Sequence, residues 1–399
     1  MDRVQCRASL LAIASLAVLM LWLWRSAAGT GVLASAQDRA EPARRLTKVT
    51  ERDRSGFIDE TGQVVIPIEY ADAGDFSEGL ARVKQHNKWG FVDLTGRVVI
   101  PIRFDCADDF SEGLARVTVG KKFGFIDRSG KLAIQAKFDF ESRDGTALVS
   151  IPRFSEGLAP VVLGGKCGYI DKAGAVVIAP AFASAEPFSD GLALVDAGSR
   201  GEIRMGFIDK SGKFAIAPRF KVAESFSEGL ARVRVETGGR SLYGYINKKG
   251  ETVIAPQFDF ALPFSEGLAP VGWGMLVNLQ QKQTPQSYGC ISDREGGIGS
   301  LPRLLPSRPP EHGTAAFIGS DGRTVNRPVS VDLGQFSEGL APVRFKQGWG
   351  YVNKTLNVVI RAQFESAYPF SNGLAQVRID DKQAFIDHDG NVVWKSKGW

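Results

Sequence analysis

The chain holds few residues of the kind that perform acid–base or metal chemistry. Its three histidines are His86, His312 and His388. His86 and His388 fall in predicted hairpin turns, and none of the three has a second ligand-type residue at the spacing of a metal site. The chain also contains no C-x-x-C, H-E-x-x-H, G-x-S-x-G or phosphate-loop motif. We therefore predict no catalytic residue, no metal site and no cofactor, and expect a protein that is not an enzyme.

One acidic position recurs and is a regular candidate for binding. It is the acidic residue of the phrase S-E-G, found at Glu78, Glu112, Glu156, Glu228, Glu266 and Glu338, with Asp190 and Asn372 as variants. In a stacked array one position becomes a line, so these carboxylates could bind cations or a basic partner. Alternatively, each Glu accepts a hydrogen bond from a nearby backbone N–H in a solvated turn.

A second acidic position recurs in the phrase D-x-x-G. It is occupied by Asp59, Asp93, Asp127, Asp171, Asp209 and Asp387, with Asn247 and Asn353 as variants. A calcium shell needs six or more oxygen ligands, and one Asp for each hairpin falls short of that. The position is better explained by Asp accepting hydrogen bonds from the backbone of its own turn. No particular binding residue is identified by either pattern.

Both acidic positions belong to a repeat that fills almost all of the chain after residue 45. The phrase FSEGL or a close variant begins at Phe76, Phe110, Phe154, Phe188, Phe226, Phe264, Phe336 and Phe370. A second phrase, G-[FY]-[IV]-[DN], begins at Gly56, Gly90, Gly124, Gly168, Gly206, Gly244 and Gly350, with Ala316 and Ala384 in place of Gly. The period is about 34 residues, which indicates a tandem array whose units depend on their neighbours for a core.

Each unit is predicted to contain three antiparallel strands. In the second unit, residues 80–83 alternate apolar and polar side chains, residues 89–93 are rich in strand-forming residues, and residues 97–100 precede Pro101. We call these strands A, B and C. The segment that returns to the next unit spaces Phe104, Ala107 and Phe110 by three residues, which suggests a tight 3₁₀-like coil.

The array begins and ends in the same phase. Leu46 opens a complete A strand, and the last unit likewise runs from A to C, so no strand is left over to complete a blade from the other terminus. We therefore expect an all-β array of nine units in an open superhelix or solenoid, with a β-propeller as the alternative. Propeller blades usually have four strands and 40–45 residues, which is longer than this unit.

The phrases Lys88-Trp89-Gly90-Phe91-Val92-Asp93, Val99-Ile100-Pro101 and Phe110-Ser111-Glu112-Gly113-Leu114-Ala115 resemble the bacterial WG (KWG) repeat. The resemblance covers residues 46–399, although the Trp itself is present only at Trp89 and Trp349. It implies an all-β repeat module of bacterial, often envelope-associated, proteins. It implies no enzymatic activity and no catalytic residue.

The N-terminus resembles an export signal. Arg3 and Arg7 precede an apolar run from Ala8 to Trp24, and small residues follow up to Ala34-Ser35-Ala36. We predict a signal peptide at residues 1–36, a linker at 37–45 and the repeat array at 46–399, in a periplasmic or extracellular protein without a membrane span after cleavage. The alternative is an uncleaved N-terminal anchor. Only Cys106, Cys167 and Cys290 would remain, and we expect all three to act as small apolar side chains.

Charge and the unit-to-unit differences bear on the partner. The net charge of +5 is too small for a nucleic-acid-binding face. In the seventh unit about 35 extra residues, 279–313, are rich in Gln, Pro, Gly and Ser and are predicted to form a flexible surface insert. The third position of the A strand varies among Arg82, Arg116, Arg232, Pro160, Pro270 and Pro342, which suggests a tolerant exposed surface.

From these features we expect a non-catalytic binding or scaffold protein of the bacterial envelope. Its expected partner is a protein, which binds through a repeat face or through residues 279–313. The alternative is a carbohydrate or cell-wall glycan, bound by exposed aromatic residues. The G-[FY] aromatics themselves are predicted to lie in the core.

Overall fold

The computed structural model describes residues 45–139, 148–149, 152–199, 202–274, 314–325 and 332–397. The predicted signal peptide at 1–36, all but the last residue of the predicted linker and the predicted insert at 279–313 lie outside these residues. Those assignments therefore stay predictions.

The described residues form nine separate β-sheets, which we call blades 1 to 9 in chain order. Blade 1 contains β1 (Thr47–Glu51), β2 (Arg54–Ile58) and β3 (Val64–Tyr70). Blade 2 contains β4 (Asp72–Ala73), β5 (Leu80–Gln85), β6 (Lys88–Asp93) and β7 (Val98–Phe104). Blade 3 contains β8 (Cys106–Ala107), β9 (Leu114–Val119), β10 (Lys122–Asp127) and β11 (Leu132–Phe138). Blade 4 contains β13 (Leu158–Leu163), β14 (Lys166–Asp171) and β15 (Val176–Phe182). Blade 5 contains β16 (Ser184–Ala185), β17 (Ala193–Asp196), β18 (Met205–Ile208) and β19 (Phe214–Phe220). Blade 6 contains β20 (Val222–Ala223), β21 (Leu230–Thr237), β22 (Arg240–Asn247) and β23 (Thr252–Phe258). Blade 7 contains β24 (Phe260–Ala261), β25 (Ala269–Trp273) and β26 (Thr314–Ile318). Blade 8 contains β27 (Leu340–Phe345), β28 (Gly348–Asn353) and β29 (Val358–Phe364). Blade 9 contains β30 (Ser366–Ser371), β31 (Leu374–Ile379), β32 (Lys382–Ile386) and β33 (Val392–Lys395). Strand β12 (Leu148–Val149) pairs in parallel with β16 of blade 5.

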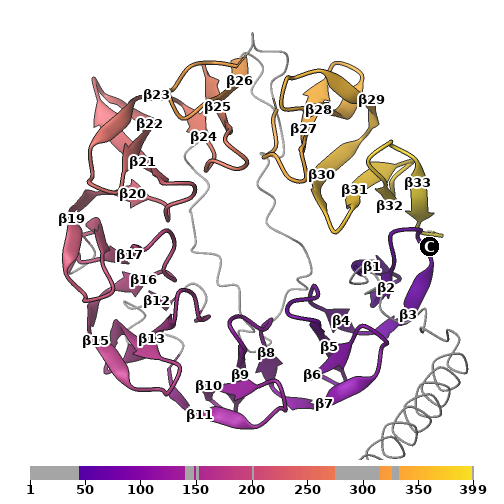
Figure 1. Ribbon diagram of the computed structural model, residues 1–399, viewed down its shortest axis with the longest axis horizontal. Helices are drawn as coiled ribbons and strands as arrows, with labels where there is room; N and C mark the ends of the chain where they lie inside the picture. Colours follow the sequence, from indigo (N-terminus) through magenta and orange to yellow (C-terminus); the bar gives the residue numbers. More distant parts are fainter. Residues whose placement is uncertain are drawn as a thin grey trace, which may run out of the picture. The chain divides into compact units, whose positions relative to one another are not determined.

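The nine blades are arranged in a closed ring around a central opening, with blade 9 beside blade 1 (Figure 1). Val49 and Ile58 of blade 1 share one buried cluster with Leu374 and Phe385 of blade 9. The backbone N–H of Lys397 also donates to Glu51 Oε1 at 2.8 Å. The chain is therefore a nine-bladed β-propeller. The prediction of an open superhelix is wrong and the propeller alternative is right, because two complete blades can close a ring by packing side by side without sharing a strand.

The return segment is a short inner strand and not a tight coil. In blade 3, Cys106 and Ala107 pair with Thr118 and Val117 of the A strand, so β8 is the innermost strand of its sheet. The spacing of three arises because Phe104 ends an outer strand, whereas Ala107 lies in the next inner strand. The predicted three-stranded unit is thus incomplete, since five blades also have a two-residue inner strand and blade 9 has a longer one.

The Gly of the G-[FY] phrase admits a bulge in the outer strand. In blade 2, Trp89 pairs with Phe104 but Phe91 pairs with Ile100, so the outer strand has two extra residues between these pairs. A Cβ at Gly90 would lie 2.6 Å from the Ile100 carbonyl oxygen and 2.7 Å from the Ile102 backbone. Blade 9 has Ala384 in this position, and there Ala384 and Phe385 pair with Lys395 and Trp394 without the extra residues. The residue type and the bulge therefore change together.

The core lies between blades. Nine clusters of buried side chains each join one blade to the next, and we call each such interface a joint, written 2/3 for blades 2 and 3. Eight joints contain a ring pair between a B-strand aromatic and the Phe of the next FSEG phrase, with centroids 4.8–5.1 Å apart. The prediction that the G-[FY] aromatics are core residues is confirmed, since Phe91 and Tyr169 are fully buried.

Candidate functional site

The FSEG turns connect each blade to the next through their Ser hydroxyls. Ser77 Oγ donates to the carbonyl oxygen of Phe110 at 2.7 Å, which crosses joint 2/3. The same bond forms from Ser111, Ser155, Ser189, Ser227, Ser265 and Ser337 to the Phe of the following phrase, at 2.6–2.8 Å. Seven consecutive joints, from 2/3 to 8/9, thus repeat one hydrogen bond.

The acidic residues of the same turns make a second bond across the same seven joints. A carboxylate oxygen of Glu78 accepts from the Gly113 N–H at 3.0 Å, and the bond recurs at Glu112, Glu156, Asp190, Glu228, Glu266 and Glu338. All seven acidic residues have a positive φ of 53–55°. We call the Ser and Glu bonds together the latch. The interpretation of Glu as the acceptor of a backbone N–H is confirmed, and the donor belongs to the next blade.

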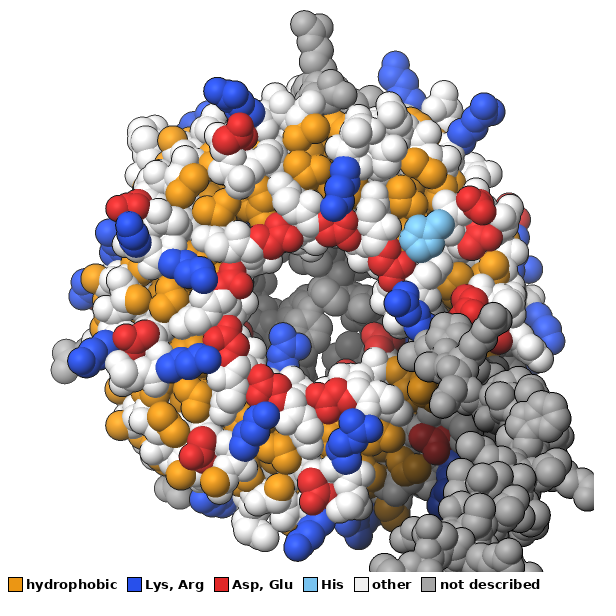
Figure 2. Space-filling model, viewed as in Figure 1, with side chains coloured by type: hydrophobic (Ala, Val, Ile, Leu, Met, Phe, Trp, Pro, Cys, Tyr) orange, Lys and Arg blue, Asp and Glu red, His pale blue; other side chains and the backbone are white. Residues whose placement is uncertain are grey.

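Basic side chains neutralise several of these carboxylates. Lys172, Lys210 and Lys354 each place Nζ 3.1 Å from the Glu of the preceding blade, and His388 Nε2 lies 3.4 Å from Glu338. Figure 2 shows acidic side chains around the central opening, with Lys and Arg side chains close to many of them. Burial alone would raise the pKa of Glu112, but hydrogen bonds from Lys172 and the Gly157 N–H outweigh it and lower that pKa. These carboxylates therefore bind groups of the ring itself, because the neighbouring blade supplies both the glycine N–H donors and the basic side chains.

The D-x-x-G turns have the local role that the sequence predicts. Asp93 Oδ1 accepts from the N–H groups of Thr95 and Arg97 at 2.9 and 3.1 Å, and from the Thr95 hydroxyl. The hydrogen bond from Thr95 is the main reason why the pKa of Asp93 is lowered. In the part of the chain that the structure describes, no group of three His, Cys, Asp or Glu residues is placed to hold a metal ion. Hairpin chemistry accounts for these residues.

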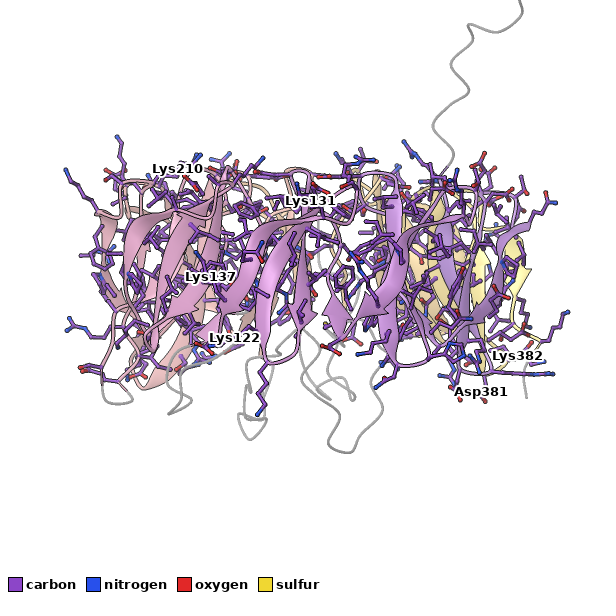
Figure 3. The ribbon with its side chains drawn as sticks, turned by 90° about the horizontal axis from the view of Figure 1, so that it is seen from below. Lys122, Lys131, Lys137, Lys210, Asp381 and Lys382 are labelled. Atoms are coloured by element: carbon purple, nitrogen blue, oxygen red, sulfur yellow. The ribbon has the colours of Figure 1, made fainter. Side chains whose placement is uncertain are left out.

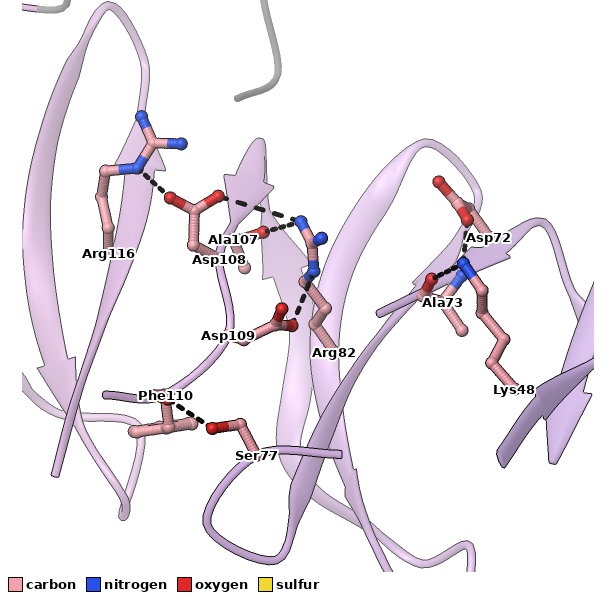
Figure 4. Close-up of polar contacts among 10 residues, drawn as sticks. All are labelled: Lys48, Asp72, Ala73, Ser77, Arg82, Ala107, Asp108, Asp109, Phe110 and Arg116. Carbon is pink, nitrogen blue, oxygen red and sulfur yellow. Dashed lines mark hydrogen bonds and ion pairs between the residues drawn. The ribbon is translucent and has the colours of Figure 1, made fainter. Parts of the chain in front are cut away.

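The third position of the A strand is not the tolerant exposed surface that we predicted. Arg116 is 4% exposed, and its Nε lies 2.5 Å from Asp108 Oδ2 (Figure 4). Arg82 Nη1 donates to the Ala107 carbonyl of the next blade at 2.9 Å. Lys48 has the same role in blade 1, where its Nζ donates to the Ala73 carbonyl at 3.0 Å. Arg82 and Lys48 are therefore further connections between blades, whereas the bond from Arg116 to Asp108 lies within blade 3.

One carboxyl group of this cluster, that of Asp109, has a raised pKa. Arg82 Nε lies 2.9 Å from Asp109 Oδ1 in an ion pair. Burial raises the pKa of Asp109, even though Arg82 beside it acts in the opposite direction. Asp108 lies between Arg82 and Arg116 and is paired with both. The cluster thus pairs two carboxylates with two arginines.

The histidines and cysteines that the structure describes form no common site. His86 is in a hairpin turn with a φ of 47°, and His388 stacks on Phe370 at 4.2 Å in a B–C turn. Cys167 is buried and unbonded, as predicted. Cys106 is disulfide-bonded, so the prediction of a merely apolar side chain is wrong there. His312 and Cys290 lie outside the described residues.

The ring has two unlike faces. The turn face bears the FSEG and B–C turns, and the hairpin face bears the A–B hairpins. Figure 3 places Lys131 and Lys210, from B–C turns, at one edge, and Lys122 and Lys382, from A–B hairpins, at the opposite edge. The chain varies in length at the hairpin face, where Asp139, Ser199 and Gly274 mark the ends of described segments. On the turn face the latch is repeated almost without change. Sequence reasoning identified the repeated positions but missed their role in joining blades.

This geometry defines a closed β-propeller built from short tandem repeats. Residues 56–89, 89–123, 123–167, 168–198, 205–236, 243–272 and 349–382 match the model of the family described as WG containing repeat. The matches cover more than half of the chain, which therefore belongs to this family. No curated protein matches the chain.

Several solved structures are similar in fold. A eukaryotic initiation factor matches with a TM-score of 0.53 and 10% identity, over 89% of this chain and 96% of that one. The dihydro-heme d1 dehydrogenase NirN matches with a TM-score of 0.40 and 10% identity, over 89% and 75% of the two chains. The extracellular domain of a one component system from B. thetaiotaomicron matches with a TM-score of 0.32 and 11% identity, over 86% and 51%. At such identities the likeness concerns the fold alone.

Proposed function

We propose that this protein is a non-catalytic binding or scaffold protein of the bacterial envelope, and that a protein partner binds its hairpin face. The observation that carries the proposal is the contrast between the faces. On the turn face the acidic residues of the FSEG turns are engaged in latches, several with an ion pair, whereas the segments that differ in length between units leave the ring at the hairpin face. Insertions gathered on one face of a repeat array often mark its binding face.

Export is part of the proposal. The sequence of residues 1–36 supports it, and so does the disulfide at Cys106, because disulfides persist mainly in oxidising compartments. Among the described residues, none belongs to a helix of the length and apolar character needed to cross a membrane. The proposed place of action is the periplasm or the cell exterior.

The test is a crosslinking pull-down from envelope extract with the chain lacking residues 1–36. The side chains of Lys166 and Arg204 lie on the hairpin face and make no described ion pair, so Lys166→Glu with Arg204→Glu forms the test variant. Lys131→Glu with Lys213→Glu, on the turn face, is the matched control. We expect a partner retained by the parent chain and the control and lost by the test variant. If no protein is retained, or if both variants behave alike, the hairpin-face proposal fails.

Glycan binding is the second candidate, and Phe214 is the residue that favours it. Phe214 is the large aromatic side chain exposed among the described residues, at 43%, on the outer strand of blade 5. An exposed ring can stack on a sugar. Retention on peptidoglycan or polysaccharide that Phe214→Ala abolishes, with no protein captured in the pull-down, would establish this candidate in place of the first.

A further inference from the structure

The joint between blade 9 and blade 1 is unlike the other eight. Among the described residues, its cluster contains four buried side chains, Val49, Ile58, Leu374 and Phe385, with the partly buried Ile68, Val393 and Trp394 packed against them. The other joints each bury eight to eleven. Because burial of apolar surface is the main favourable term in such interfaces, joint 9/1 is the least stabilised of the nine.

The polar connections are also reduced at this joint. Blade 9 still has Ser371 and Asn372 in the latch positions, but the chain before β1 has Pro42-Ala43-Arg44-Arg45 where the other units have FSEG. Among the described residues, no ring pair and no latch bond crosses joint 9/1. One hydrogen bond, from the Lys397 N–H to Glu51, is described there.

Chain connectivity also indicates that joint 9/1 is the weakest of the nine joints. Every other pair of neighbouring blades is joined by the polypeptide, but blades 9 and 1 are not. Separation at joint 9/1 therefore breaks only the small apolar cluster and its few polar contacts, and each blade can keep its own strand pairing.

We propose that the ring opens reversibly at joint 9/1 while the blades remain folded. Opening exposes Val49 and Phe385 and gives lateral access to the central opening. This inference concerns the ring itself and does not depend on the identity of the partner.

The test measures two distances by electron paramagnetic resonance. Spin labels enter as a non-canonical amino acid, which leaves the native cysteines untouched. One pair, at Arg54 and Lys382, spans joint 9/1, and the control pair, at Lys122 and Lys166, spans joint 3/4 at the same position of each hairpin. In urea below the global unfolding transition, we expect a second, longer distance for the Arg54–Lys382 pair and a single distance for the control pair. If both pairs change together at the transition, the proposal is overturned.

A second variant tests the joint in the absence of urea. Gly62, in the B–C turn of blade 1, has a φ of 82°, and an added Cβ would overlap the Val393 carbonyl oxygen of blade 9. Gly390 has the equivalent place at joint 8/9, with a φ of 85°, where an added Cβ would lie 2.9 Å from Ile360 Cγ2. Gly62→Ala should lengthen the Arg54–Lys382 distance, whereas Gly390→Ala should leave it unchanged. A folded Gly62→Ala protein with the parent distance would overturn the proposal.

Discussion

At the scale of single residues, the acidic position of FSEG combines backbone strain with a bond to the next blade. A positive φ is uncommon for Glu and disfavours it relative to Gly or Asn. Glu is nevertheless used at six of the eight FSEG turns, where its carboxylate reaches the Gly N–H of the next phrase. Asn372 has the same φ range, at 57°, but blade 1 offers it no FSEG phrase. Where no latch can form, the residue is one that adopts this conformation easily, so the latch explains the choice of Glu.

Phe110→Ala tests the contribution of one ring pair. Phe110 is 2% exposed and lies 4.9 Å from the Phe91 ring across joint 2/3. We expect the free energy of unfolding to fall by roughly 3–5 kcal/mol, as for other truncations of buried aromatic residues. Chemical denaturation of the purified chain measures it, and Val176→Ala, at a half-exposed side chain on an outer strand, should cost no more than about 1 kcal/mol. Equal losses for the two variants would show that the ring pairs do not hold the joints.

At the scale of elements, the three main strands of each unit follow from the sequence, but the inner strand does not. Alternation in Leu80–Val83 and the turn phrase from Asp93 to Gly96 each report a local conformation. Pro101, however, does not end the third strand as predicted: β7 continues to Phe104, because it is the edge strand of its sheet, where a missing N–H is tolerated. The inner strand has only two residues, and Cys106 and Ala107 pair with a strand that follows the next turn. Two residues carry no periodic pattern, so this strand depends on tertiary pairing that local patterns do not record.

Gly90→Ala tests the link between the small residue and the bulge. The new Cβ would lie under 3 Å from the backbone of Ile100 and Ile102, so the outer strand of blade 2 must shift. We expect a loss of about 3 kcal/mol or more, as for overpacking against backbone. The matched control is Ala384→Gly, where no bulge of this kind exists and only about 1 kcal/mol should be lost. Denaturation midpoints compare the two, and a Gly90→Ala loss no larger than the control would contradict the argument.

At the scale of the whole molecule, the charge of one repeated position in the sequence reflects the closure of the ring. In blades 4, 5 and 8 the residue after the turn Asp or Asn is Lys172, Lys210 or Lys354, and each pairs with a Glu of the preceding blade. The equivalent residue in blade 1 is Glu60, and blade 9, which precedes it in the ring, has Asn372 in place of Glu. An acidic pair is thus avoided at a joint that exists only if the ring closes. Strand phase alone favoured an open array because it ignores side-by-side packing, whereas these charges indicate closure.

The latch carboxylates also make the stability of the ring dependent on pH. The pKa values of Glu112 and Glu266 are lowered from the ordinary value of 4.5, because hydrogen bonds from Lys172 and Lys354 and from glycine N–H groups outweigh the opposing effect of burial. The unfolded chain therefore binds protons more readily than the folded one, and stability rises with pH in this range. The stabilisation is complete above about pH 4.5 and is lost as the pH falls through the lower folded pKa values.

The double variant Glu112→Gln with Glu266→Gln isolates this effect. Gln can still accept the glycine N–H bonds but cannot pair with Lys172 or Lys354, so at pH 7 we expect a loss of about 1–2 kcal/mol, since each half-exposed ion pair contributes about 0.5–1 kcal/mol. The difference from the parent chain should shrink toward zero as the pH falls below 4.5 and through the lowered folded pKa values, because the parent carboxylates then become protonated. Urea denaturation at each pH gives both curves, and Glu60→Gln, on the same face but outside the latches, should follow the parent. A gap that stays constant with pH would mean that the carboxylates stabilise the joints by packing and not by their charge.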